Sequence, residues 1–467
     1  MTLRQPTVLI RRLLTRIDVD RAVLYGVLGT AQLFLTGPVT ALIVAIALTA
    51  ELQGYYYTFA ALLALQILVE LGFAQVIVQF ASHEWAHLRL RADRSIEGDA
   101  DAHSRLASLA RMATGWYWGC SALLGIGLAT AGVLFFGAEG SDDVSWTGPW
   151  IAIALLTAVD FAILPLWSLL QGANQMTAYN FARLVSGLLL IPMLWGSLLL
   201  GGELWSVALA KVVSLSWEIG VILRYRRFFA SLLRKRDGPT MRWRGEILPV
   251  QWRIALSWMA GYFAFQIFTP VVFHYEGAAE AGRWGMTWGL VMAVSALATT
   301  WIYTRAPAFG SLIAERRYAE LDAAFRRTAA GAVGLCILAS VAGVSAIAAI
   351  QATDLDLGDR LLSPGTAACL FIAATLMQVS FAQSTYLRAH KAEPFLAISL
   401  ITGAGVAGIT LAAGSLWGTT GIAVGYLALT LLVVTPLSTR LFLRLRREWH
   451  APVRARDDDV RVSTITS

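Results

Sequence analysis

The chain carries long apolar stretches in close succession, and this feature limits its fold more than any other. A helix needs about 20 apolar residues to cross the hydrocarbon core of a bilayer. The stretches that meet this length are residues 22–49, 55–81, 113–137, 147–170, 179–201, 204–224, 253–275, 284–305, 327–350, 365–387, 394–415 and 420–440. Apolar helices inside a soluble protein would need a polar outer layer that this chain lacks. We therefore predict an all-α membrane protein with twelve transmembrane helices.

The composition agrees with a membrane protein and excludes other classes. Only 14% of residues are charged, against about 25% in soluble globular proteins, which excludes a large soluble domain. The three cysteines lie far apart and the six histidines lack metal-ligand spacing. The chain therefore predicts no disulfide framework, no metal site and no cofactor.

The positions of the cations set the orientation. If both termini and every second loop face the cytoplasm, that side holds 34 of the 37 Lys and Arg residues. The opposite loops hold only Arg283 and Arg360, and Lys211 lies inside the sixth stretch. Cytoplasmic loops of membrane proteins are enriched in Lys and Arg. The net charge of +7 is thus interpreted as a topology signal and an attraction to lipid head groups, with no nucleic-acid partner.

The chain divides into five predicted parts. Residues 1–21 form a basic amphipathic segment on the membrane surface, and residues 22–224 form an N-terminal lobe of six helices. Residues 225–252 are a basic cytoplasmic linker, whose run 226–236 we expect to be a helix lying in the membrane interface. A second six-helix lobe covers 253–447, and residues 448–467 form a disordered tail.

The two lobes are predicted to be pseudo-symmetric copies. Pro38 lies within the first stretch, at Gly37-Pro38, and Pro270 lies at the matching place in the seventh, at Thr269-Pro270. A repeat of six helices enters the membrane from the same side each time, so the axis relating the copies lies along the membrane normal. Proline removes a helical hydrogen bond and permits bending. Pro38 and Pro270 are therefore either hinges or static kinks.

Ionisable residues inside the predicted spans are the candidate functional groups, because a charge at the bilayer centre costs about 2.5–3.5 kcal/mol. Glu70, with Gln66 one turn earlier, and Asp160 suit coupling to a cation or proton, or an interhelical contact. Gln378 falls near the repeat equivalent of Asp160. Lys211 suits either an anionic substrate group or a counter-ion role toward Asp160 or Glu218. Glu218 lies near the predicted cytoplasmic end, where its carboxylate is expected to reach water.

Two arginines at predicted cytoplasmic helix mouths, Arg183 and Arg305, have two interpretations. An arginine binds phosphate well because its planar fork matches the phosphate oxygens. It also anchors a helix end on the cytoplasmic side with no further role. The predicted outward loops are short and acidic, and none is long enough for a catalytic domain. We therefore do not expect an enzyme.

Several sequence runs resemble a known group of membrane proteins. They are Gly54-Tyr-Tyr-Tyr-Thr-Phe-Ala-Ala-Leu-Leu-Ala-Leu-Gln66, Glu70-Leu-Gly-Phe73, Gln79-Phe-Ala-Ser-His-Glu-Trp85 and Leu169-Leu-Gln-Gly-Ala-Asn174. They resemble lipid-linked oligosaccharide flippases of the Wzx type, within the multidrug/oligosaccharidyl-lipid/polysaccharide exporter superfamily.

The resemblance implies a function in cell-surface polysaccharide biosynthesis. It implies movement of a polyprenyl-pyrophosphate-linked glycan across the bacterial inner membrane by alternating access, coupled to H⁺, Na⁺ or the membrane potential. Such a substrate favours an arginine-lined cavity, whereas the charges inside these spans are mostly acidic. A cation-coupled multidrug antiporter of the same superfamily is therefore the alternative.

Overall fold

The computed structural model describes residues 21–141, 143–235, 237–353, 356–390 and 392–450. The predicted surface segment before Arg21 and the predicted tail after His450 lie outside these residues. The chain separates into two compact units, residues 1–258 and 259–467. Each unit is described by itself.

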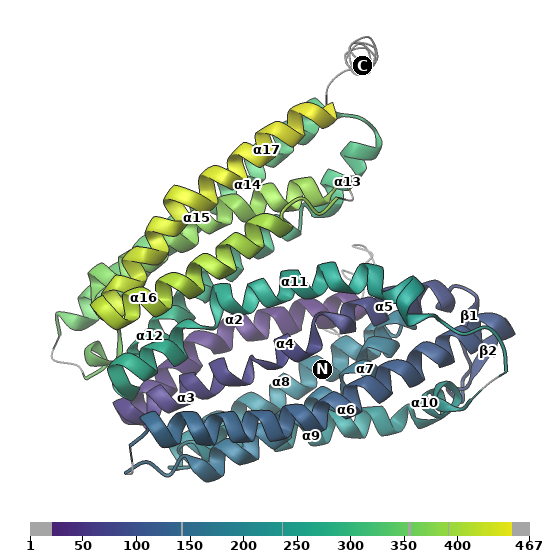
Figure 1. The fold of residues 1–467 in the computed structure, drawn as a ribbon, viewed down its shortest axis with the longest axis horizontal. Coiled ribbons are helices and arrows are strands. Elements are labelled where there is room, and N and C mark those ends of the chain that lie inside the picture. The colour runs from purple at the N-terminus through teal and green to yellow at the C-terminus, as the bar shows by residue number, and fades with distance from the viewer. Residues whose placement is uncertain (1–20, 142, 236, 354–355, 391, 451–467) are drawn as a thin grey trace, which may run out of the picture. The chain divides into compact units, whose positions relative to one another are not determined.

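The first unit is a helical bundle with one small hairpin (Figure 1). Its elements are α2 (Arg21–Ala47), α3 (Ala50–Leu63), α4 (Gln66–Glu70), α5 (Phe73–Trp85), β1 (Leu88–Leu90), β2 (Ile96–Gly98), α6 (Ala100–Glu139), α7 (Thr147–Gly172), α8 (Met176–Leu199), α9 (Trp205–Arg224), α10 (Arg226–Leu233) and the π-helix η1 (Trp243–Ile247). Helix α11 (Leu248–Phe265) begins in this unit and ends in the second.

The regular elements of the second unit are all helices in its described residues. Its elements are α12 (Phe268–Tyr303), α13 (Ala306–Ala314), α14 (Tyr318–Gln351), the short 3₁₀-helix η2 (Gly358–Arg360), α15 (Pro364–Arg388), α16 (Leu396–Leu429), the π-helix η3 (Thr430–Val434) and α17 (Thr435–His450).

Ten helical segments of the described residues are long and apolar enough to cross a membrane. Two of them, Ile254–Ala314 and Leu396–His450, run for 61 and 55 residues, well beyond the ~20 needed for one crossing. Each contains a glycine with non-helical backbone angles, Gly277 in α12 and Gly418 in α16. These breaks fall at the short turns expected between the seventh and eighth and the eleventh and twelfth stretches. The number twelve itself remains a prediction.

The apolar surface agrees with lipid as the solvent. Leu33 and Leu35 on α2, Leu123 on α6 and Leu338 on α14 are each more than 70% exposed. Soluble proteins rarely expose large contiguous apolar patches. Aromatic side chains fill the interior instead. In the first unit, Phe59 and Trp150 meet with ring centroids 5.0 Å apart. Phe268 and Trp288 meet at the same separation in the second.

The same helix pairs pack within both units. In the first, α6 packs on α7, α5 on α7, α2 on α8 and α7 on α9. In the second, α14 packs on α15, α12 on α15, α12 on α16 and α15 on α17. If the spans are numbered in order within each half, α6 on α7 corresponds to α14 on α15, and α7 on α9 corresponds to α15 on α17. The internal repeat as a whole stays a prediction.

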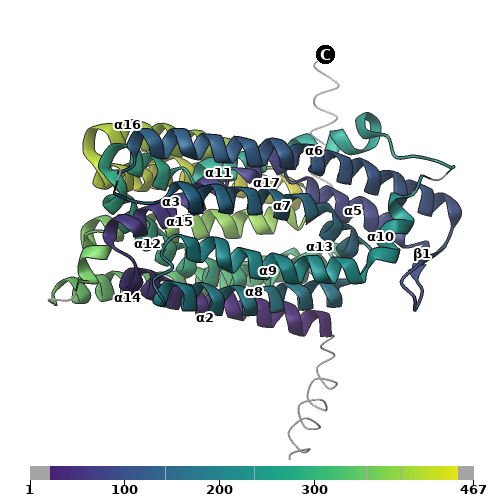
Figure 2. The ribbon, with the colours of Figure 1, turned by 90° about the horizontal axis from the view of Figure 1, so that it is seen from below.

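Three local features differ from the sequence prediction. The chain was expected to be all-α, but β1 and β2 form an antiparallel hairpin with Arg89 opposite Glu97. The hairpin projects beside α10 at one end of the unit (Figure 2). In it, the guanidinium of Arg91 donates to Glu97 and holds the pKa of that carboxyl at about 2.

Helix α6 is the second difference, because it begins at Ala100 rather than near residue 113. The Asp99 carboxylate accepts a hydrogen bond from the Ala102 amide at 2.8 Å and so caps the helix. The third is α10, which was expected to lie in the membrane interface. Its apolar residues Phe228 and Leu232 are fully buried, because α10 packs on α6. The structure therefore places this apolar face inside the protein.

Candidate functional site

Three helices of the first unit, α2, α8 and α9, lie side by side and enclose a cavity of about 360 Å³. Small residues allow α2 to approach α8. The Gln32 amide on α2 lies so close to Gly187 on α8 that a Cβ there would be 2.7 Å from its nitrogen. One turn from the start of α8, the Asn180 amide donates to the Ala22 carbonyl at 2.8 Å. The cavity therefore has a fixed wall on the α2 side.

Glu218 on α9 is the most buried charged group of the cavity, with a side chain only 4% exposed. Its Oε1 accepts hydrogen bonds from the Ser186 hydroxyl at 2.7 Å and from the Arg183 guanidinium at 3.3 Å. Among the described residues its Oε2 is buried and has no hydrogen-bond partner. The carboxylate is therefore held through one oxygen only.

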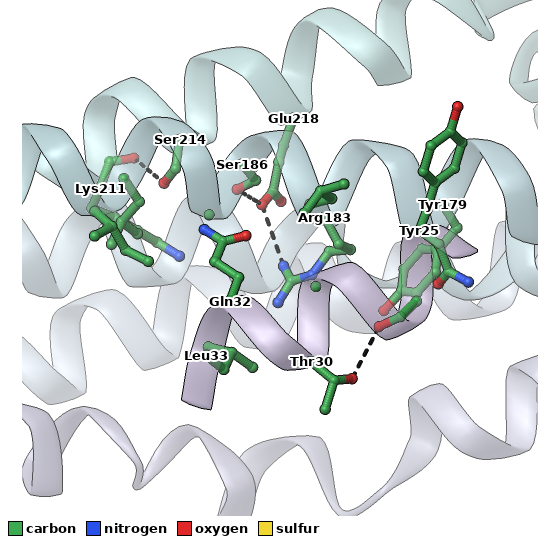
Figure 3. Close-up of a pocket in the computed structure, with 17 residues that line it drawn as sticks. Tyr25, Thr30, Gln32, Leu33, Tyr179, Arg183, Ser186, Lys211, Ser214 and Glu218 are labelled. Carbon is green, nitrogen blue, oxygen red and sulfur yellow. Dashed lines mark hydrogen bonds and ion pairs between the residues drawn. The ribbon is translucent and has the colours of Figure 1, made fainter. Parts of the chain in front are cut away.

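Arg183 on α8 is 55% exposed and also lines the cavity. Its guanidinium reaches from α8 toward α2, and the Gln32 side chain lies between Arg183 and Lys211 in Figure 3. Since a guanidinium has five N–H donors and one of them contacts Glu218 here, the others face a space that a ligand can enter.

Lys211 on α9 lines the same cavity, yet its ammonium group is already engaged. Nζ lies 2.7 Å from Asp160 Oδ2 on α7. The two side chains are 23% and 28% exposed. Of the two interpretations that the sequence left open for Lys211, the structure places it with the carboxylate. Asp160 accordingly acts as its counter-ion.

Arg183, Lys211 and Glu218 line the cavity, whereas Asp160 holds Lys211 from outside its lining, so the charges form two separate pairs. Serine, tyrosine and amide groups complete its wall, including Tyr25, Tyr179 and Ser214. Such a wall can bind a polar or anionic group. The apolar outer faces of the same helices, such as Leu35 on α2, are exposed where lipid is expected.

Comparisons with known proteins rest on structure. The sequence matches no family model, and no curated protein matches it. A multidrug resistance MATE-family transporter of the MOP superfamily, in an inward-facing conformation, aligns with 90% of this chain and 99% of its own, with a TM-score of 0.65 and 13% identity. The lipid II flippase MurJ, in an inward closed conformation, aligns with 91% of this chain and 90% of its own, with a TM-score of 0.65 and 12% identity.

A third solved structure is the MATE multidrug transporter DinF-BH. It aligns with 92% of this chain and 95% of its own, with a TM-score of 0.58 and 14% identity. The chain shares its overall fold with these three solved structures. Together with the ten apolar helical segments, this fold supports a multi-pass membrane protein. At these identities the likeness concerns the fold alone.

Two predicted site residues lie away from the cavity, at a break in the second predicted span. Gln66 opens α4, and Glu70 ends it with 9% exposure. Leu71 and Gly72 then adopt left-handed backbone angles, with φ of 53° and 66°. The Gln251 amide on α11 donates to the Leu71 carbonyl at 2.7 Å. Glu70 is therefore buried beside an interrupted helix and separate from the cavity.

The remaining predicted residues lie outside the cavity as well. Gln378 is buried on α15, where its Oε1 accepts a hydrogen bond from Thr299 at 3.2 Å. Arg305 is exposed and immediately precedes α13. Pro38 lies inside the continuous helix α2, and Pro270 lies in the first turn of α12 just after the junction with α11. Their roles as hinges stay predictions.

Glu218 is the residue whose position the sequence misjudged. It was expected to reach water near a helix end, but it turns inward to Ser186 and Arg183 on the neighbouring helix. These partners lie 32 and 35 residues away in the chain. A signal was present, since Lys211, Ser214 and Glu218 share one helical face, and all three line the cavity.

Proposed function

We propose that the chain is a transporter that flips a polyprenyl-pyrophosphate-linked oligosaccharide across the bacterial inner membrane by alternating access. The fold supports a transporter, because the similar solved structures include a multidrug transporter and a lipid II flippase. The cavity between α2, α8 and α9 is where we place the anionic part of the substrate.

Arg183 is the observation that carries this proposal. Its guanidinium lines the cavity, is about half exposed and makes one long contact with Glu218. Arginine pairs with phosphate through two parallel N–H···O bonds, and Arg183 has donors to spare for such a pair. Gln32 and the serine and tyrosine groups of the wall would then hydrogen-bond the adjoining oxygens.

The second candidate function is a cation-coupled multidrug antiporter. One observation favours it, namely the Glu218 carboxylate, which is buried in the same cavity and has an unbonded oxygen among the described residues. A buried carboxylate suits a cationic drug or a coupling cation as well as it suits Arg183. The two candidates differ in the charge of the substrate.

Reconstitution separates them. Purified protein in liposomes is given a polyprenyl-pyrophosphate-linked N-acetylglucosamine whose fluorophore is quenched by external dithionite. We expect faster loss of inner-leaflet fluorescence than in empty liposomes. Arg183→Ala should slow it at least about tenfold, since the loss of a charge-assisted hydrogen bond costs about 1.5–3 kcal/mol. Arg226→Ala is the matched control, because Arg226 is an exposed arginine of the same unit outside the cavity.

A different pattern would contradict the flippase. If the wild-type protein leaves the glycan lipid where it is but exchanges ethidium against a proton or sodium gradient, the antiporter is correct. Equal rates for Arg183→Ala and Arg226→Ala would show that the cavity is not where the pyrophosphate binds.

A further inference from the structure

Glu218 is bonded incompletely for a carboxylate buried this deeply. A carboxylate offers about four acceptor positions. Two contacts reach Glu218, both at Oε1, and the one from Arg183 is long at 3.3 Å. Its Oε2 is buried and has no hydrogen-bond partner among the described residues. Ser186 is neutral, so the negative charge of Glu218 is balanced by Arg183.

The other charged and titratable groups around Glu218 do not change this balance. From α8 come Arg183 and Tyr179, and from α2 comes Tyr25. On α9 itself Lys211 is the nearby cation of the cavity, and it is held at 2.7 Å by Asp160 of α7. Lys211 and Asp160 neutralise each other, which leaves Arg183 as the counter-ion of Glu218.

Arg183 cannot serve two anions equally well. If the pyrophosphate of a substrate takes its donors in a two-bond contact, the guanidinium is drawn away from Glu218. A buried charge that loses its partner is strongly disfavoured, and such a group takes the neutral form instead. Glu218 becomes neutral by accepting one proton.

We propose that Arg183 pairs with Glu218 when the cavity is empty and with the substrate's pyrophosphate when it is filled, and that Glu218 takes up one proton from water in the second state. This inference rests on the proposed function, because it requires an anionic substrate. The neutral carboxylic acid donates its new O–H to the Ser186 hydroxyl oxygen, which accepts as readily as it donates. When the substrate leaves, the proton returns to water and Arg183 returns to Glu218.

The consequence is that substrate binding and protonation are coupled at one site. Because Glu218 is protonated in the loaded state, the cavity gains one negative charge less than the substrate carries. Asp160 has no part in this exchange, because Lys211 remains its partner throughout.

Calorimetric titration measures the proton directly. Purified full-length protein in detergent is titrated at pH 7 with farnesyl pyrophosphate as the probe, in buffers of different ionisation enthalpy. The wild-type protein should take up about one proton more per bound probe than Glu218→Gln, since both proteins see the same titration of the probe. As the pH is raised, the wild-type Kd for farnesyl pyrophosphate should rise about tenfold per pH unit relative to the Kd of Glu218→Gln. Glu203→Gln, at an exposed carboxylate of the same unit outside the cavity, is the control and should keep the extra proton.

A second measurement does not depend on any variant. Infrared difference spectra of the wild-type protein should gain the carbonyl band of a protonated carboxylic acid when farnesyl pyrophosphate binds. Binding with the same proton uptake in wild type and Glu218→Gln, and no such band, would overturn the inference while the proposed anionic substrate stands. A different outcome would overturn the proposed function and this inference together. In that outcome the protein does not bind farnesyl pyrophosphate, but it binds the cation tetraphenylphosphonium and releases protons as it does so.

Discussion

At the scale of single residues, the first unit contains two ion pairs of opposite character. Lys211 and Asp160 meet at 2.7 Å, and each is about a quarter exposed. Arg183 and Glu218 meet at 3.3 Å, with one partner half exposed and the other buried. A short pair with matched burial is stable as it stands. A long pair with an exposed arginine can exchange partners more easily, and for this reason we propose a function for the second pair and a structural role for the first.

The structural pair can be tested by its removal. Asp160→Asn and Lys211→Met should each destabilise the protein by about 1–3 kcal/mol, because each leaves a partly buried polar partner without its contact. The double variant should recover most of that loss, since no unpaired charge remains. The apparent melting temperature in detergent, followed by size-exclusion chromatography after heating, reports the stability. Additive losses in the double variant would contradict a direct pair.

At this scale the sequence identified the ionisable residues but not all of their partners. An ionisable residue inside an apolar stretch is visible in the sequence, and so Asp160 and Lys211 were identified as candidates. Which group Glu218 contacts depends on how α8 is rotated against α9, and no short-range pattern records that rotation. Its partner Arg183 was likewise interpreted as either a phosphate contact or an anchor.

At the scale of elements, glycine breaks shape several long helices. Gly418 in α16 has φ of 59° and ψ of −152°. The Glu276 carboxylate accepts a hydrogen bond from the Thr419 amide at 3.1 Å, and Glu280 accepts one from the Thr419 hydroxyl at 3.0 Å. Glu276 of α12 therefore caps the helix segment that starts after Gly418, and Glu280 of the same helix holds the Thr419 side chain. A carboxylate at such a start is also favoured by the helix dipole.

Replacing this glycine should break the cap. A Cβ at position 418 would lie 1.6 Å from Glu276 Oε1, and the backbone angles are available to glycine almost alone. We expect Gly418→Ala to destabilise the protein by about 1–3 kcal/mol and to lower its apparent melting temperature. Gly408→Ala in the same helix is the control, because nothing lies within 4 Å of its Cβ position. An equal loss of stability in both variants would contradict this explanation, because helix propensity favours alanine over glycine at position 408.

The apolar stretches predicted the long helices well, because burial in lipid depends on composition over many residues. The interruptions were harder to predict. The break at Leu71–Gly72 requires a leucine with φ of 53°, which its own sequence does not favour. It depends on Gln251, 180 positions further on, to bond the Leu71 carbonyl. The strands of the hairpin β1–β2 have only three residues each, Leu88–Leu90 and Ile96–Gly98, which is too short for a clear strand signal.

At the scale of the whole molecule, the number and direction of the membrane crossings remain to be tested. Six predicted spans precede the cytoplasmic linker, so the sidedness of later residues depends on the two long segments. If Ile254–Ala314 crosses twice, Glu315 lies in the cytoplasm, and if it crosses once, Glu315 lies outside. The sidedness of Glu448 reports in the same way on Leu396–His450. The two kinks at Gly277 and Gly418 favour two crossings for each segment.

Single cysteines placed on either side of the membrane decide the matter. In a variant lacking Cys120, Cys336 and Cys369, cysteines are introduced at 89, 143, 315, 359 and 448, all exposed positions. A membrane-impermeant maleimide added to intact cells should label positions 143 and 359, whereas 89, 315 and 448 should react only after permeabilisation. This pattern follows from the enrichment of Lys and Arg in cytoplasmic loops. Labelling of 315 in intact cells would reduce the first long segment to one crossing. If position 448 is labelled and position 315 is not, the second long segment crosses only once, because an odd number of spans then places the C-terminal end of α17 outside.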